Sequence, residues 1–364
     1  MNTPRYDIII IGAGPAGSTL ARLLAPRFRV LVIEKRPLNR SSRGGPAGTK
    51  CCGGLLAPDA QETLARLGLG VPRGVCAGPQ LFTVRTIDLD NGLESYYQRH
   101  YLNIDRESFD RWLISLVPGS VDVRCGCRFA GFTEDASGVT VRFIQNGKER
   151  SARAHVLAGA DGASSRVRAA LFPGEEFHRT YLALQEWVRV DSPLPYFSAI
   201  FDREITDFYS WTIPKDGHLL VGTALAPRDE PWKKFALLKE KLAAYGYRFP
   251  RAGKVKGTLL LRPARSSQVR CGAGRIALLG EAAGFISPTS AEGISYAMKS
   301  AMALAAAASD GGIDSFLSRY RRAATPIARN VFMKNFKAPF MYSAPLRALV
   351  MRTGLLAMKM YGDG

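Results

Sequence analysis

The chain has 364 residues, 46% of them hydrophobic, and a formal net charge of +19. This length accommodates two domains or one large interrupted domain with a sizeable core. No run of 18 apolar residues predicts a membrane-spanning helix, and the first strand begins without a secretory signal pattern, so we expect a cytoplasmic protein. The six cysteines form no C-x-x-C pair and the four histidines lack zinc-ligand spacing, which predicts neither a disulfide framework nor a metal site.

The first strand, turn and helix carry a phosphate-binding pattern. Residues 8–11 are apolar and β-branched, as in a buried parallel strand, and residues 16–25 predict a helix. Between them, G-A-G-P-A-G allows a tight turn, approach of a pyrophosphate and packing of the helix on the strand. A second strand over 28–33 ends at an acid suited to ribose hydroxyls, which disfavours a 2′-phosphate. The predicted dinucleotide contacts are Gly12, Gly14, Pro15, Ala16, Gly17, Glu34 and Lys35.

A loop over 40–49 then leads into K-C-C-G-G, and the small residues Cys52, Gly53 and Gly54 indicate close backbone approach to a flat group. A helix is predicted over 59–68. Strands over 81–89 and 94–101 flank a hairpin turn at Asn91-Gly92. Asp105 caps the next helix, and Arg106 in its first turn is a candidate cofactor contact.

Two more strands end in glycine-rich turns. A strand over 154–158 precedes G-A-D-G-A-S-S-R-V-R, in which Asp161 and Gly162 suit a second phosphate-binding turn. A strand over 275–279 precedes G-E-A-A-G, whose candidate contacts are Gly280, Glu281, Ala283 and Gly284. Three such strand ends fit a long dinucleotide such as FAD.

Between these turns the pattern changes to a separate antiparallel sheet. The predicted strands and the helix that crosses them cover residues 181–190, 197–202, 208–213, 219–224 and 232–245. A small-residue helix over 294–308 then completes the nucleotide-binding part.

The three glycine-rich motifs, in this order, resemble the flavoprotein superfamily that includes the group A aromatic hydroxylases. Within it, K-C-C-G-G-L-L-A-P-D-A and Y-S-W-T-I-P-K resemble the Cys-Gly-Gly and Tyr-x-Trp-x-Phe-Pro motifs of the geranylgeranyl reductase family. The stretch G-E-A-A-G-F-I-S-P-T-S-A-E-G-I resembles that family's third motif, with Glu281 in place of Asp and Ala291 in place of Gly. The chain also resembles the bacterial CbrA-like subgroup, from residue 6 to about residue 320.

This resemblance implies an α/β fold. It comprises a Rossmann-like, three-layer FAD-binding domain of the glutathione-reductase-2 type, an inserted antiparallel β-sheet substrate domain and a C-terminal helical segment. We assign residues 1–80, 101–178 and 264–325 to the first, 81–100 and 179–263 to the second, and 326–364 to the third. Gly293 and Ile294 join the predicted FAD contacts.

The resemblance also implies reduction of a prenyl C=C bond by reduced FAD, with a hydrophobic or lipid substrate. Cys52, Tyr209 and Trp211 are the candidates for positioning or proton delivery, although strand aromatics are often core residues and Cys52 could serve only packing. An external donor, NAD(P)H or a ferredoxin-like protein, is expected. Two alternatives stay open: an FAD-dependent monooxygenase acting on an electron-rich substrate, and a flavin-bearing lipid-binding protein.

The charge concentrates at the carboxy terminus. Residues 315–362 contain no Asp or Glu, and nine basic residues alternate there with Phe, Met, Leu and Val. This mixture indicates an interfacial amphipathic helix at an anionic membrane surface more than a nucleic-acid-binding module. The alternative is a helical cover whose basic face is solvated.

Overall fold

The computed structural model describes residues 5–38, 50–175, 177, 179–191, 194–249, 253–310 and 315–353. The chain forms two compact units. Unit 1 comprises Met1–Arg43, Phe109–His178 and Pro263–Met333, and unit 2 comprises Gly44–Ser108, Arg179–Arg262 and Lys334–Gly364. The loop predicted over 40–49 and the last eleven residues, with Lys359, lie outside the described residues.

Unit 1 is built on a parallel sheet of strand order β16-β9-β1-β2-β6. Its strands are β1 (Arg5–Ile11), β2 (Val30–Glu34), β6 (Asp122–Cys125), β9 (Lys148–Gly159) and β16 (Ile276–Leu278). The side chains of Ile9 and Ile10 are fully buried although they point to opposite faces, as in a sheet covered on both sides. The antiparallel strands β7 (Cys127–Asp135), β8 (Gly138–Gln145) and β15 (Gly272–Ala273) extend the sheet.

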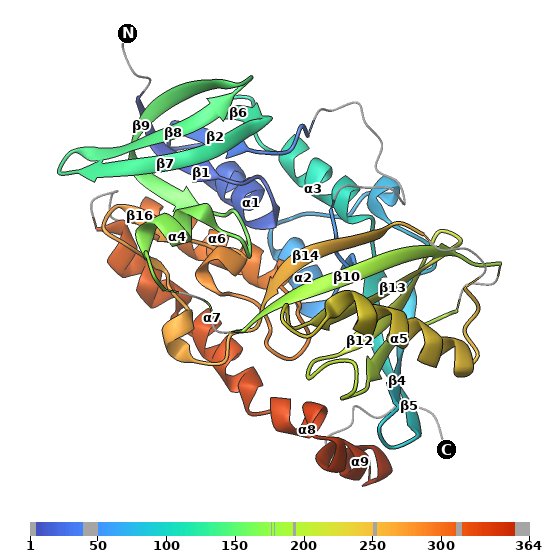
Figure 1. Ribbon diagram of the computed structural model, residues 1–364. Helices are drawn as coiled ribbons and strands as arrows, with labels where there is room; N and C mark the ends of the chain where they lie inside the picture. The colour runs from blue at the N-terminus through green and yellow to red at the C-terminus, as the bar shows by residue number, and fades with distance from the viewer. Residues whose placement is uncertain are drawn as a thin grey trace. The chain divides into compact units, whose positions relative to one another are not determined.

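Small residues let two helices pack closely in unit 1. Helix α1 packs against α6, whose sequence is rich in alanine (Figure 1). Tyr320 of α7 is fully buried, and its hydroxyl donates to the carbonyl of Leu278 at the end of β16 over 2.8 Å. The helices with residues in this unit are α1 (Pro15–Leu24), α3 (Arg106–Ser115), α4 (Arg166–Leu171), α6 (Ile294–Ser309) and α7 (Phe316–Asn335).

Unit 2 is built on a second sheet, of strand order β14-β10-β13-β12-β11-β4-β5-β3. Its strands are β3 (Leu55–Leu56), β4 (Leu81–Asp88), β5 (Leu93–Asn103), β10 (Thr180–Arg189), β11 (Phe197–Phe201), β12 (Ser210–Lys215), β13 (His218–Leu225) and β14 (Val255–Leu261). Helix α5 (Pro231–Ala244) crosses β10 and β13 and buries Phe235, Leu238 and Leu242 (Figure 1). The other helices are α2 (Pro58–Arg66), α8 (Ala338–Tyr342) and α9 (Ala344–Thr353).

Most predicted elements are present, with four strands missed and one pairing different from expectation. The patterns did not predict β7, β14 or the two-residue strands β3 and β15, and Gly257 interrupts the apolar run of β14. Strands β4 and β11 pair in parallel, because they come from separate chain segments and no hairpin fixes their direction. Residues 50–80 group with the sheet of unit 2, because β3 pairs with β5, whereas the predicted FAD-binding domain includes them.

Among the described helices, none is both long and apolar enough to cross a membrane.

Candidate functional site

The three glycine-rich turns of unit 1 lie side by side at one edge of its sheet. In the register, Ile11 is paired with Gly159, and Gly159 with Leu278, so the three strands end together. Gly12 has a φ of +100°, and a Cβ atom there would lie 2.6 Å from the carbonyl oxygen of Ala160 in the second turn. Ligands of open α/β sheets bind at the carboxyl ends of the strands, so this edge is the candidate nucleotide site.

The first turn has room for a phosphate. A Cβ atom on Gly17 would lie 1.8 Å from the Gly12 carbonyl oxygen, so only glycine lets α1 pack on the turn. A Cβ atom on Gly14 would meet nothing within 4 Å, and Gly14 caps α1 without a side-chain hydrogen bond. Backbone N–H groups at a helix start without a side-chain cap are open to anions and attract them. This geometry fits the pyrophosphate of a dinucleotide.

Glu34 lies where the sequence predicts it, 3% exposed at the end of β2. Its carboxylate accepts hydrogen bonds from the Ala13 N–H over 2.6 Å, the Arg36 N–H over 2.8 Å and Arg36 Nε over 3.0 Å. Burial alone would raise the pKa of Glu34, but Arg36 and these N–H groups hold it below its ordinary value. A fixed carboxylate beside the glycine turn fits the ribose of FAD.

The second turn is held by its own acid. Asp161 accepts hydrogen bonds from Ser165 Oγ over 2.6 Å and from the Arg166 N–H over 2.8 Å at the start of α4. Burial raises the pKa of Asp161, and these hydrogen bonds partly oppose the rise. Arg168 then donates to the carbonyls of Ala282 over 3.1 Å and Gln268 over 2.8 Å, which ties the second turn to the third.

The third turn is a 3₁₀ turn over Gly280–Ala283, and Gly280 and Gly284 both adopt positive φ angles. The Gly280 N–H donates to Ser300 Oγ of α6 over 3.0 Å. Gly293 caps α6, and Ile294 is its first residue. The remaining predicted contacts in unit 1 are Pro15 and Ala16 in the first turn of α1, exposed Lys35 after β2, Gly162 in the second turn, and Glu281 and Ala283 in the third; their contacts with a cofactor stay predictions.

Unit 2 contains a second cluster of functional side chains, which we call the thiol–lysine cluster: Cys52, Gly54, Asn103, Arg106 and Lys215. Cys52 Sγ accepts from Arg106 Nη1 and from the Gly54 N–H, each over 3.4 Å. Burial alone would raise the pKa of Cys52, but the Arg106 guanidinium and the Gly54 N–H lower it below its ordinary value. The pKa of the adjacent Cys51 is raised by burial to about 12, so the two thiols differ strongly.

Lys215 is a candidate functional residue that our sequence analysis missed. It ends the Y-S-W-T-I-P-K stretch, and its side chain is 1% exposed. Its Nζ atom donates to Asn103 Oδ1 over 2.5 Å and to the carbonyls of Ile104 over 2.7 Å and Gly54 over 3.1 Å. Burial lowers the pKa of Lys215 to about 8, and the charge of Cys52 acts in the opposite direction. A lysine at the end of a strand usually reaches solvent, so only the fold reveals this one.

A small pocket opens beside this cluster. It is lined by Lys50, Cys52, Ile104, Asp105, Arg106, Glu107, Trp187 and Lys215. The Cys52 thiol and the buried Lys215 thus line the same pocket.

Tyr209 and Trp211 lie in an aromatic cluster of the same unit. Their ring centroids are 5.5 Å apart, and Phe208 lies 4.9 Å from Tyr209. Trp211 is 7% exposed and stacks over Gly222, where a Cβ atom would lie 2.5 Å from the indole. Among the described residues, no partner accepts the buried Trp211 Nε1–H. A buried donor of this kind suits a ligand acceptor, although packing alone explains the ring.

A model of the FAD-binding domain family matches residues 5–230. The chain belongs to this family. It is 41% identical to Protein CbrA of Escherichia coli O6:H1 over 350 residues, covering 96% of this chain and 94% of that protein. A CbrA of Shigella flexneri serotype 5b is 42% identical over 357 residues, with the same coverage. The named relatives are thus CbrA proteins, and the narrower prediction of a geranylgeranyl reductase goes beyond the family that is shown.

Solved structures of two kinds share the fold. A geranylgeranyl bacteriochlorophyll reductase-like protein from Thermoplasma acidophilum superposes with a TM-score of 0.79 at 21% identity, covering 96% of this chain and 91% of that one. Aklavinone-11 hydroxylase, solved with FAD and aklavinone, superposes with a TM-score of 0.69 at 22% identity, covering 96% and 71%. The predicted α/β fold and the FAD cofactor are confirmed, and the protein is an FAD-dependent oxidoreductase. Reductases and hydroxylases share its fold, so the fold does not choose between their reactions.

Proposed function

We propose that this enzyme reduces C=C bonds of a prenyl or polyprenyl lipid. The observation that carries the proposal is the contact between the two motifs that resemble those of the reductases. Lys215 of the Y-S-W-T-I-P-K stretch donates to Gly54 of the K-C-C-G-G loop, 161 residues away. A Cβ atom on Gly53 would lie 3.0 Å from Ile213, so the two stretches also pack directly.

Reduction of an isolated double bond needs a hydride at one carbon and a proton at the other. Reduced FAD, when bound, supplies the hydride and is oxidised, and an external donor restores its electrons. The chain must supply the proton. Cys52 Sγ, which lines the pocket, can carry the proton as the thiol and pass it to the substrate carbon, which leaves a thiolate. Lys215 in the ammonium form can then return a proton to that thiolate.

The other residues of the cluster maintain this arrangement. Asn103 Oδ1 accepts a hydrogen bond from Lys215 Nζ, and Asn103 Nδ2 donates to the carbonyls of Pro79 over 2.9 Å and Pro214 over 2.8 Å. Arg106 stabilises the negative charge left on Cys52 after proton transfer. Tyr209 and Trp211 offer flat apolar faces on which a prenyl chain can lie.

The second candidate is oxygenation of an electron-rich substrate. It is favoured by the fold shared with aklavinone-11 hydroxylase, which was solved with FAD and aklavinone. In that case the thiol–lysine cluster would stabilise the fold of unit 2 and take no part in the reaction.

Mass spectrometry of polyprenyl lipids, incubated with the chemically reduced holoenzyme with and without oxygen, separates these reactions. We expect products that gain pairs of hydrogen atoms without oxygen. A product with an added oxygen atom, formed only in air, would contradict reduction and support the second candidate. Unchanged lipids under both conditions would contradict both reduction and oxygenation of a lipid. The remaining alternatives would be a lipid-binding protein or an enzyme with another substrate.

The same assay tests the proton donor. Replacing Lys215 by Met should lower the rate of reduction strongly. Lys215→Arg keeps the charge but does not release a proton near neutral pH, so it should not restore the rate. Recovery with Arg would mean that charge alone matters. Because the ammonium form is the proton source, the wild-type rate should fall as the pH rises through about 8. A flat pH profile across that range would remove Lys215 from the reaction.

A further inference from the structure

We propose that the C-terminal segment, residues 336–353, docks unit 2 onto an anionic lipid bilayer. This inference concerns a binding surface and does not depend on the reaction. Its starting point is the stretch 315–362, which lacks Asp and Glu and carries nine basic residues.

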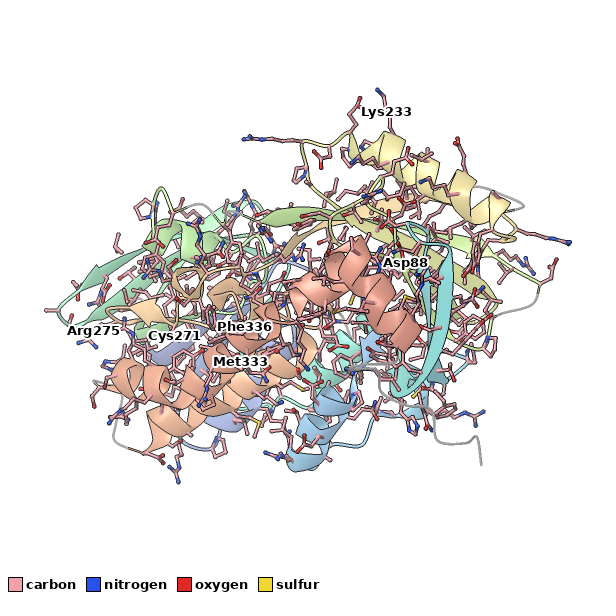
Figure 2. The ribbon with its side chains drawn as sticks, turned by 90° about the horizontal axis from the view of Figure 1, so that it is seen from below. Asp88, Lys233, Cys271, Arg275, Met333 and Phe336 are labelled. Carbon is pink, nitrogen blue, oxygen red and sulfur yellow. The ribbon has the colours of Figure 1, made fainter. Side chains whose placement is uncertain are left out.

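One face of the segment is fastened to unit 2. Arg347 is 5% exposed, and its Nη2 atom lies 2.7 Å from Asp88 Oδ1 and 2.6 Å from Asp90 Oδ2. Asp88, in the hairpin between β4 and β5, is labelled in Figure 2. Asn91 of the same hairpin donates to the carbonyl of Ala344 over 3.0 Å. Arg347 therefore belongs to a buried ion pair and not to the basic face that the sequence suggested.

Tyr342 fastens the same face at a second point. Its ring centroid lies 5.3 Å from that of Phe208, and the Arg262 guanidinium lies 4.4 Å from both centroids. These aromatic and cation–π contacts hold α8 on the aromatic cluster of unit 2. The segment is thus attached along its length, at Tyr342 and at Arg347.

Other side chains of the segment are apolar and exposed to solvent. Phe336 is 62% exposed, Phe340 43% and Leu349 58%, and Figure 2 labels Phe336. Phe340 is two positions from Tyr342, and Leu349 is two positions from Arg347. Two positions along a helix turn a side chain to nearly the opposite side, so the anchored and exposed faces are distinct.

The charge around this exposed face identifies its partner. Lys337 and Arg352 are exposed beside it, and no carboxylate occurs in the segment. Aromatic rings flanked by cations are typical of helices that lie in the interface of an anionic bilayer. If two copies of this chain met through this surface, each would present the same cations to the other, and the repulsion between like charges would oppose the contact. An anionic bilayer therefore fits the surface better than self-association.

Vesicle co-sedimentation of the full-length, FAD-loaded protein tests the proposal. The vesicles are either phosphatidylcholine alone or phosphatidylcholine with phosphatidylglycerol. We expect binding to the anionic vesicles that weakens in high salt, and a loss of at least about tenfold in affinity for the variant F336S/F340S. The control is Phe82→Ser, at a ring 58% exposed on β4 of the same unit, which should bind as the wild type does.

The variant K337E/R352E provides an independent test if the serine variant does not fold. It should also lose binding to anionic vesicles while keeping its FAD. Wild-type protein that stays in the supernatant, or serine and charge variants that bind like the wild type, would overturn the proposal. A dimer in solution that the serine variant dissociates, without vesicle binding, would assign the surface to a second copy instead.

Discussion

The edge of the sheet in unit 1 and the thiol–lysine cluster of unit 2 are assembled in different ways. The edge uses backbone turns that lie within a few residues of each strand end. Its first turn, for example, needs only Gly12, Gly14 and Gly17, which are close together in the sequence. The cluster uses side chains from three distant places, Cys52, Arg106 and Lys215, which only the fold brings together. A site made of local backbone can be recognised from a motif, whereas a site made of distant side chains cannot.

The largest expected effect tests the backbone site. Gly17→Ala places a Cβ atom 1.8 Å from the Gly12 carbonyl, so we expect destabilisation of more than about 3 kcal/mol and loss of FAD. Gly14→Ala is the matched control, because its Cβ atom meets nothing within 4 Å and the fold should survive with weakened FAD binding. Thermal unfolding and the ratio of flavin to protein absorbance measure both effects. Equal stability of the two variants would contradict the close packing of α1 on the turn.

The next effect tests how far unit 2 depends on distant charges. Arg347→Met leaves Asp88 buried without its partner, which should cost about 3–5 kcal/mol of unfolding free energy. Arg352→Met, at an exposed position of the same helix, should change it by less than about 0.5 kcal/mol. Urea unfolding checks both values. A small effect of the first variant would mean that the segment is held mainly by Tyr342.

The third prediction concerns Glu34, whose carboxylate accepts from the backbone of the first glycine turn and is the proposed ribose contact. Glu34→Ala removes the acceptor of the Ala13 N–H and the proposed ribose contact, so FAD affinity should fall about tenfold to a hundredfold. Fluorescence titration of the apoprotein with FAD measures this change. Glu149→Ala, an exposed position of the same unit, serves as control. Full FAD affinity of the Glu34 variant would contradict the assignment.

The smallest effect concerns the cluster itself. Because the pKa of Cys52 is lowered and that of Cys51 is raised to about 12, iodoacetamide should alkylate Cys52 far faster near neutral pH. Lys215→Met removes a cation that interacts with the thiolate, so the pKa of Cys52 should rise and alkylation at neutral pH should slow by about tenfold. Peptide mass spectrometry against pH separates the two thiols. Unchanged alkylation of Cys52 in this variant would show that Lys215 does not set its reactivity.

Local signals made much of unit 1 predictable. Glycines followed by a helix, and an acid about twenty residues later, were enough to predict the first turn and Glu34. Asp105 caps α3 as expected and accepts from the Ser108 N–H over 2.7 Å, and Asn91-Gly92 lies in the predicted hairpin turn between β4 and β5. These features depend on backbone geometry within a few residues, which the sequence encodes directly.

The sequence by itself determined the nucleotide-binding turns, the FAD cofactor and most strands, because each follows from periodicity or from the conformational freedom of glycine at a turn. The tertiary structure alone decided that Lys215 is buried against Gly54 and Ile104, that Arg347 pairs with Asp88, and that β4 lies parallel to β11. The physical reason is the same in each case. Burial and pairing of a charge depend on neighbours more than 100 positions away, and no local pattern encodes those neighbours.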